Sequence, residues 1–261
     1  MKIFLSIFLS FILALLAYIK NAMTKPALLL AFIFSCLITY YGDIISFIIL
    51  LIVFLGSLIG SKIKNNIRNQ IQNDIILKPH QKDIFQIIAN VGIGTFSIII
   101  YAITKNELLL IIYSSIMAES LADTLASDIG VLSKKTPINI LTLKKGQRGL
   151  SGNISSIGLI SSFIGALLIG LIYYSSNFQI PNLLIITISG FIGAIIDSFL
   201  GASIQVQYIC PKCHKITERK EHCNQKTTHY KGKKIINNDV VNFLSNFIAG
   251  IISLITLIIL K

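Results

Sequence analysis

Residues 108–130 read LLLIIYSSIMAESLADTLASDIG, and this stretch decides the class of fold. Its apolar residues continue for the length that one helical crossing of a bilayer needs, about 20 residues. Its second half nevertheless contains the acidic residues Glu119, Asp123 and Asp128. Lipid accepts only backbone whose polar groups are paired internally, so we predict a helix over 108–127. Acidic residues inside such a helix indicate a functional site.

The rest of the chain has the same apolar character. Of its 261 residues, 54% are hydrophobic and 13% are charged. A soluble domain has roughly 25% charged residues, so a soluble enzyme and a disordered chain are both excluded. The apolar residues form continuous blocks instead of alternating with period two, which excludes an outer-membrane barrel.

Eight apolar segments are predicted to span the membrane as helices. The fold class is therefore an all-α, polytopic membrane protein, with one membrane domain over 1–261. The predicted spans are Ile3–Ile19, Ala27–Tyr41, Ile44–Gly60, Ile84–Ile103, Leu108–Ser127, Ile154–Tyr174, Leu183–Gly201 and Val240–Leu260. A cleaved signal peptide is the alternative for the first segment, because Lys2 precedes its apolar core.

Basic residues are distributed unequally between the predicted connections. Of the 23 Lys and Arg, only Lys2, Lys105 and Lys261 fall on one side, and the other 20 fall on the opposite side. Positively charged connections stay in the cytoplasm, so the long loops are predicted inside and both termini outside. The net charge of +12 follows from this partition, and we expect no binding of nucleic acid.

Acidic residues gather near one level of the predicted membrane domain. Five of the eleven lie within or at the ends of spans: Glu119, Asp123, Asp128, Asp197 and Asp239. The topology places Asn90 and Asn242 at the same cytoplasmic level. Converging carboxylates and amides are suitable ligands for Mg²⁺. The alternatives are helix caps at Asp128 and Asp239, and interhelical contacts for the asparagine stripe 238, 242 and 246.

The loop KKGQRGLSGN at 144–153 is a candidate phosphate-binding segment. Glycines and small polar residues ahead of a helix can offer backbone N–H groups to an anion, and Lys144, Lys145 and Arg148 would add positive charge. The loop lacks the spacing of a Walker motif. A glycine-rich turn with ordinary cytoplasmic lysines would look the same.

The last cytoplasmic loop, 203–238, contains a candidate zinc site. It holds three of the four cysteines of the chain. The Cys210–Cys213 CxxC turn is followed by His222 and Cys223 nine and ten residues later, a set of residues that can bind Zn²⁺. We predict a small zinc knuckle here; the alternative is a reduced loop without metal, because the cytoplasm disfavours disulfides.

Several of these segments, in this order, resemble an integral membrane family that includes plant phytyl-phosphate kinase and animal transmembrane protein nineteen. Many members of this family have no assigned function. The resembling segments are QIIAN at 86–90, ESLADTLASDIG at 119–130, the loop 146–152, DSFLGA at 197–202 with Gln205, and NDVVN at 238–242.

The resemblance implies a CTP-dependent kinase of a prenyl monophosphate at the cytoplasmic membrane interface. It implies that Asp123, Asp197 and Asp239 bind Mg²⁺, and that Glu119 or Asp128 positions a metal-bound water or the attacking phosphate. The remaining roles fall to residues that hold nucleotide phosphates or complete a polar wall: Lys144, Lys145, Arg148, Asn90 and Asn242. The implied partners are the lipid bilayer, CTP and an isoprenoid phosphate.

Other functions use the same residues. A CTP-dependent lipid-phosphate cytidylyltransferase would need nearly the same site, a transporter could use the buried carboxylates, and a scaffold is a further alternative. A transporter built from inverted repeats places its site near the midplane between two related halves. The one-sided polar residues and the absence of an internal sequence repeat favour an enzyme.

Overall fold

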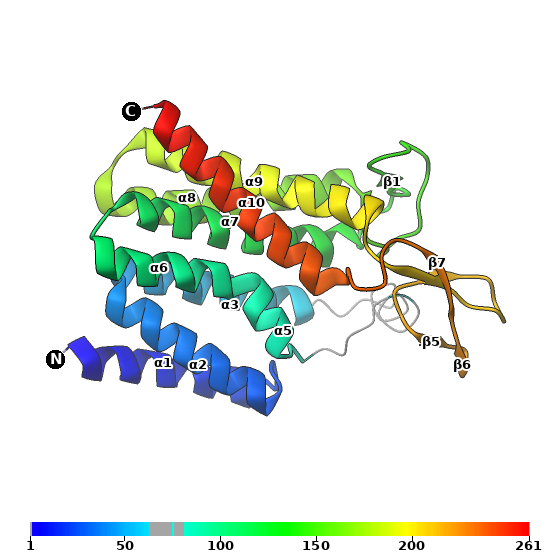
Figure 1. Ribbon diagram of the computed structural model, residues 1–261, viewed down its shortest axis with the longest axis horizontal. Coiled ribbons are helices and arrows are strands. Elements are labelled where there is room, and N and C mark those ends of the chain that lie inside the picture. The colour runs from blue at the N-terminus through cyan, green and yellow to red at the C-terminus, as the bar shows by residue number, and fades with distance from the viewer. Residues whose placement is uncertain (1, 63–74, 76–80, 261) are drawn as a thin grey trace.

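The part of the chain that the structure describes folds as a bundle of eight helical spans with an extramembrane lobe at one end (Figure 1). The structure is a computed structural model that describes residues 2–62, 75 and 81–260. The helices are α1 (Lys2–Ile19), α2 (Lys25–Tyr41), α3 (Ile44–Lys62), α5 (Ile84–Ile87) continued by η1 (Ile88–Gly92) and α6 (Ile93–Thr104), α7 (Leu108–Gly130), α8 (Ser156–Asn177), α9 (Ile180–Ser203) and α10 (Asn238–Ile259).

The predicted class, an all-α membrane protein, is confirmed, and the described helices agree roughly with eight spans. Within the described residues, six helical segments are long and apolar enough to cross a membrane: α1, Ile84–Thr104, α7, α8, α9 and α10. The other two predicted spans, α2 and Ile44–Ile59 of α3, are shorter apolar helices.

Local signals explain where several helices begin. Asp83 caps α5 by accepting a hydrogen bond from the backbone N–H of Gln86, whose side chain in turn accepts one from the N–H of Asp83. Asn237 caps α10 by accepting a hydrogen bond from the N–H of Val240 at 3.1 Å. Asp239 is therefore not the cap of α10, and its burial needs another explanation.

Helix α7 lies at the centre of the bundle and packs against α3, α6, α8, α9 and α10. Small residues allow this close packing. A Cβ atom at Gly190 of α9 would lie 2.6 Å from the Cβ of Ala118, and one at Gly165 of α8 would lie 3.2 Å from the Cα of Ala122. Glycines at these positions let the neighbouring backbones approach, as in other membrane helix pairs.

Short strands form in the connections at one end of the bundle. β1 (Ile138–Asn139) pairs with β2 (Asn153–Ile154) between α7 and α8. Between α9 and α10, residues 204–237 form a structure that we call the hairpin lobe. Its strands are β3 (Gln207–Ile209), β4 (Ile216–Thr217), β5 (Glu221–His222), β6 (Gln225–Lys226) and β7 (Thr228–Lys231). The order β4-β3-β7 makes one sheet, and β5 and β6 form a separate hairpin.

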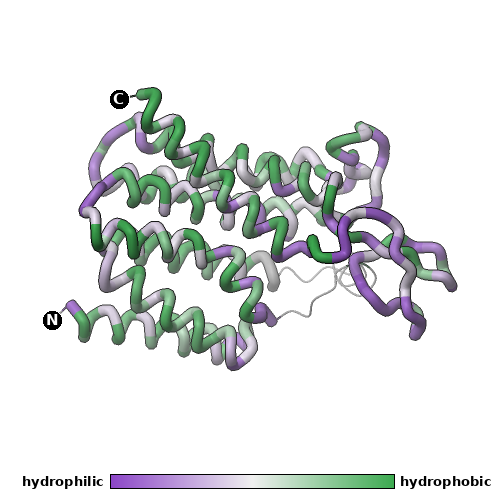
Figure 2. The backbone as a smooth tube through the Cα atoms, viewed as in Figure 1, coloured by the Kyte–Doolittle hydropathy of each residue, from purple (hydrophilic) through white to green (hydrophobic). Residues whose placement is uncertain are grey.

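Polar residues gather at the lobe end, whereas α1 begins and α10 ends at the opposite end (Figures 1 and 2). The connections α1–α2, α7–α8 and α9–α10 all lie at the lobe end (Figure 1). This arrangement agrees with the partition of basic residues between alternate connections. Four of those basic residues, Lys64, Arg68, Lys78 and Lys261, lie outside the described residues.

Candidate functional site

A cavity of about 430 Å³ opens at the lobe end of the bundle. Helices α7, α9 and α10, the loop 148–155 and the hairpin lobe all contribute to its walls. Its acidic residues are Asp123, Asp128, Asp197, Asp239 and Glu218, and its basic residues are Lys82, Arg148, Lys220 and Lys234. Groups that are more than 100 residues apart in sequence thus surround one space.

Glu119 lies behind the cavity wall and connects to it through Ser245. The Ser245 hydroxyl lies 2.6 Å from Glu119 Oε1, 3.2 Å from Asp197 Oδ2 and 3.0 Å from the backbone oxygen of Asn242. Glu119 and Asp197 are both buried, and Glu119 Oε2 has no hydrogen-bond partner among the described residues. Since one hydroxyl proton cannot serve two buried carboxylates, a shared proton or a bound cation would stabilise the pair.

Gly193 makes room for this pair of carboxylates. A Cβ atom at this position would lie 2.6 Å from Glu119 Cγ and 2.8 Å from the Cβ of Ala249. Glycine is therefore required where α7, α9 and α10 meet beside the acidic residues. The same helix brings Gly201 against the loop 148–155, where a Cβ atom would lie 3.0 Å from that of Ser151.

The asparagine stripe of α10 has two separate roles. Asn246 donates to the backbone oxygen of Ala89 at 3.1 Å and accepts from the Ser120 hydroxyl at 3.0 Å. It therefore satisfies the backbone of η1, a π-helical segment of a kind that often occurs at functional sites. Asn242 lines the cavity, and its amide, oriented to suit its neighbours, donates to Asp197 Oδ2 at 3.2 Å.

Asn90 also lines the cavity, from the middle of η1. Its amide donates to the backbone oxygen of Gln86 at 2.7 Å, and its own backbone oxygen lies 2.7 Å from the Ser120 hydroxyl, which it shares with Asn246. The π-helical segment thus directs the Asn90 side chain toward the cavity, while the backbone oxygens of Gln86 and Asn90 remain hydrogen-bonded.

Lys82 is a site residue that the sequence analysis counted only for membrane topology. Hydrogen bonds with Ala22 and Thr24 fix its backbone to the turn between α1 and α2. Burial lowers the pKa of its ammonium group, and the carboxylates of Asp128 and Asp123 partly oppose that shift. The signal in the sequence was its position just before the capping residue Asp83, at the start of an apolar span that contains Gln86 and Asn90.

The predicted phosphate-binding lysines are placed differently. Arg148 lines the cavity and donates to the backbone oxygen of Lys134 at 2.8 Å. Lys144 and Lys145 are exposed and are not among the residues that line the cavity. Lys220 and Lys234 of the hairpin lobe stand there instead, and nothing in their local sequence distinguished them from other basic residues of the loop.

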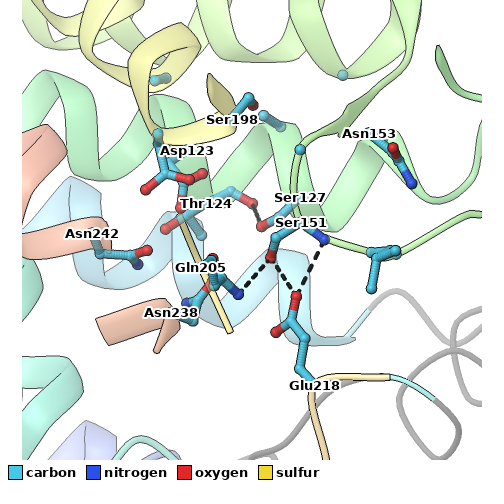
Figure 3. A pocket seen from close by; sticks show the side chains of 18 of the residues that line it. Asp123, Thr124, Ser127, Ser151, Asn153, Ser198, Gln205, Glu218, Asn238 and Asn242 are labelled. Carbon is cyan, nitrogen blue, oxygen red and sulfur yellow. Dashed lines mark hydrogen bonds between the residues drawn. The ribbon is translucent and has the colours of Figure 1, made fainter. Parts of the chain in front are cut away.

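The glycine-rich loop holds an anionic group from its own chain. The backbone N–H and the hydroxyl of Ser151 both donate to Glu218 Oε1, and Gln205 donates to the same hydroxyl at 3.0 Å (Figure 3). Burial raises the pKa of the Glu218 carboxyl, and the hydrogen bonds from Ser151 oppose that shift. Gly152, with φ +84°, packs so tightly on α9 that a Cβ atom would lie 2.4 Å from the Cβ of Ala202.

The predicted zinc ligands lie together in the hairpin lobe. The ligand atoms of Cys210, Cys213, His222 and Cys223 are all within 4.8 Å of one another, and these residues are not among those that line the acidic cavity. Among the described residues, the chain therefore has two separate groups of candidate functional residues.

Comparisons with known proteins agree with the membrane fold. The sequence profile described as Integral membrane protein DUF92 matches residues 8–250. Protein PGR of Arabidopsis thaliana is 31% identical over 135 residues, which cover 47% of this chain and 46% of that protein. An uncharacterized membrane protein of Methanocaldococcus jannaschii is 29% identical over 171 residues, which cover 66% of this chain and 60% of that protein. No solved structure matches the chain.

Proposed function

The chain belongs to the integral membrane family DUF92, and from that premise we propose that it is a Mg²⁺- and CTP-dependent kinase of an isoprenoid monophosphate. One observation supports this proposal most strongly. A cavity of about 430 Å³ at the polar end of the bundle is lined by Asp123, Asp197 and Asp239 together with Lys82 and Arg148. Phosphoryl transfer depends mainly on positioning and on charge stabilisation, and these residues are suited to both.

The carboxylates are suitable Mg²⁺ ligands. Asp123, Asp197 and Asp239 come from α7, α9 and α10, so three rigid helices would hold the hard oxygen ligands that Mg²⁺ prefers. The unsatisfied oxygen of buried Glu119 indicates that this part of the protein is suited to an additional positive charge. When bound, Mg²⁺ would neutralise part of the phosphate charge.

The basic groups of the chain would hold and orient the phosphates. Lys82 comes from the segment before α5, Arg148 from the α7–α8 loop and Lys220 from the hairpin lobe, so cationic side chains approach the cavity from different elements. In this arrangement Asn242 keeps Asp197 oriented, and Glu119 and Ser245 support it from behind.

A small apolar recess of about 40 Å³ adjoins the cavity, and we propose that the lipid approaches from this side. The two spaces share Ser57, Lys82, Gln86 and Asn90. The apolar lining of the recess comes from α1, α2, α3 and η1 and includes Leu13, Ala31, Leu50, Phe54 and Val91. A prenyl phosphate could thus place its headgroup among the polar residues while its chain points into the bilayer. From the partition of basic residues we infer that this end faces the cytoplasm, where CTP is available.

The test uses the full chain purified in nanodiscs, with Mg²⁺, CTP labelled on its γ-phosphate or its cytidine, and a panel of prenyl monophosphates. We expect γ-label in a prenyl diphosphate. Cytidine label in a lipid would instead establish a cytidylyltransferase. The absence of both turnover and Mg²⁺-dependent CTP binding would contradict either reaction and favour transport.

A further inference from the structure

The Cys–His group of the hairpin lobe has the dimensions of a metal site. His222 Nδ1 lies 3.4 Å from Cys213 Sγ and 3.2 Å from Cys223 Sγ. With Zn–S bonds of about 2.3 Å and Zn–N bonds of about 2.0 Å, the ligand atoms of a tetrahedral site are about 3.5 to 3.8 Å apart. The four ligand atoms, all within 4.8 Å of one another, therefore need only small adjustments to surround one ion.

The two backbone segments that carry these ligands, the CxxC turn and the β5–β6 hairpin, are both bent sharply. The CxxC turn is closed by hydrogen bonds from His214 N to Cys210 O at 2.9 Å and from Cys210 N to Lys215 O at 3.0 Å. The β5–β6 hairpin turns through Cys223 and Asn224, with φ of 51° and 58°. Such turns favour glycine and asparagine, so a cysteine here adopts an uncommon conformation that places its thiol beside His222.

The surrounding lobe has little apolar core of its own. Its strands are two to four residues long, and the hydrophobic residues buried within it are Val206, Tyr208 and Cys210. Structures this small usually need a metal or disulfides to fold stably. The four cysteines of the chain are free thiols, and the cytoplasmic location that we propose for this end disfavours disulfides.

We propose that Cys210, Cys213, His222 and Cys223 bind one structural Zn²⁺ ion that fixes the hairpin lobe against the acidic cavity. Three thiolates and one imidazole are a common zinc set, and four protein ligands leave no open position for catalysis. The resulting complex carries a charge of −1, which suits a lobe rich in basic residues.

The ion would act on the cavity through β4. This strand follows the CxxC turn directly, and Glu218 comes immediately after it. Glu218 in turn binds the backbone N–H of Ser151 at 3.2 Å, in the glycine-rich loop. The metal therefore orients a wall of the cavity without touching any bound substrate. This inference does not depend on the proposed kinase activity.

The test measures zinc in the full chain, purified in detergent under reducing conditions after growth with added Zn²⁺. Elemental analysis should find about one Zn²⁺ per chain. Cys213→Ser and Cys223→Ser should lose most of it, while Cys36→Ser, which changes the cysteine in α2, should retain it. A chain without zinc, or zinc that survives both ligand substitutions, would overturn the proposal.

A second measurement applies if the variants fail to fold. Wild-type protein is treated with a chelator, then supplied with Zn²⁺ or Mg²⁺, and limited proteolysis is followed at residues 204–237. Faster cleavage after chelation, reversed by Zn²⁺ alone, is the expected result. Cleavage unchanged by chelation, or a disulfide among these cysteines found by non-reducing mass spectrometry, would overturn the proposal.

Discussion

The acidic cavity and the Cys–His group of the hairpin lobe differ in how their residues come together. The four residues of the Cys–His group lie within 14 positions of the chain, between Cys210 and Cys223. The acidic cavity combines residues from 57 to 242 and depends on the packing of α7, α9 and α10. A local turn and a hairpin can form the first group, whereas only the assembled bundle can form the second.

This difference separates the effects that we expect from mutation. A residue of the acidic cavity is held by helices that pack through many other contacts, so its loss should mainly affect function. A ligand of the Cys–His group supports a lobe with little core, so its loss should mainly affect local structure.

The largest effect is expected from Asp123→Asn and Asp197→Asn. Each removes a negative charge but preserves the shape of the side chain, so prenyl-phosphate phosphorylation should fall on the order of 100-fold or more. Thermal unfolding and size-exclusion profiles should stay close to those of the wild type. Glu107→Gln, an exposed residue just before α7, is the matched control. Full activity in both aspartate variants would remove the acidic cavity from the proposed mechanism.

Removal of zinc should loosen the hairpin lobe and leave the bundle intact. Amide hydrogen exchange in 204–237 should accelerate on the order of tenfold after chelation, because metal binding and local folding are coupled. Exchange in α7, the most buried of the six long spans, should not change. Equal acceleration in both regions would show that the two are not independent.

Gly193→Ala should destabilise the junction of the helices. The new methyl group would lie 2.6 Å from Glu119 Cγ and 2.8 Å from Ala249 Cβ, and overpacking of this kind costs about 1 to 3 kcal/mol. A lower unfolding temperature in detergent would report it. Gly92→Ala is the control, since its methyl group would meet its nearest atom at 3.5 Å. Equal stability of the two variants would argue against close packing at Gly193.

The two asparagines of α10 allow a sharper comparison within one helix. Asn246→Ala leaves the Ala89 backbone oxygen without this donor, which should lower the free energy of unfolding by about 1 to 3 kcal/mol. Asn242→Ala should lower activity more than stability, because Asn242 lines the cavity and orients Asp197. The unfolding temperature and the activity of both variants are measured together. A larger loss of stability in Asn242→Ala and a larger loss of activity in Asn246→Ala would contradict these roles.

The smallest effect concerns Glu218 and pH. Burial raises the pKa of its carboxyl group, so the folded lobe holds this proton more tightly than the unfolded chain does. Its contribution to lobe stability is therefore greatest below the ordinary carboxyl pKa and declines as pH rises through the raised value. Glu218→Gln should not show that decline. Hydrogen exchange in the lobe is compared between wild type and variant from below the ordinary carboxyl pKa to above the raised value. Any effect of pH on zinc binding is common to both proteins, so the difference between them reports Glu218 alone. Parallel pH profiles would contradict it.

Features that depend on residues close together in the sequence could be predicted from the sequence. Apolar length and the partition of basic residues predicted the eight spans, and the spacing of Cys210, Cys213, His222 and Cys223 predicted a group that the structure does bring together. The acidic residues were recognised because a carboxylate inside a span is costly without a partner.

The choice among similar polar residues depended on tertiary structure. Lys144 and Lys145 looked like the phosphate ligands, yet Lys82 lines the cavity because its backbone bonds to the α1–α2 turn. Asn242 and Asn246 share one helical face, but it is Asn246 that donates to the η1 backbone, at Ala89, whereas Asn242 lines the cavity.

The sequence by itself determined that this is a helical membrane protein with most of its basic residues at one end, because the cost of placing charge in lipid acts on each segment separately. Only the tertiary structure decided which of those residues face one another. That choice depends on how glycines such as Gly190 and Gly193 let α9 approach α7, a close packing between segments about 70 residues apart.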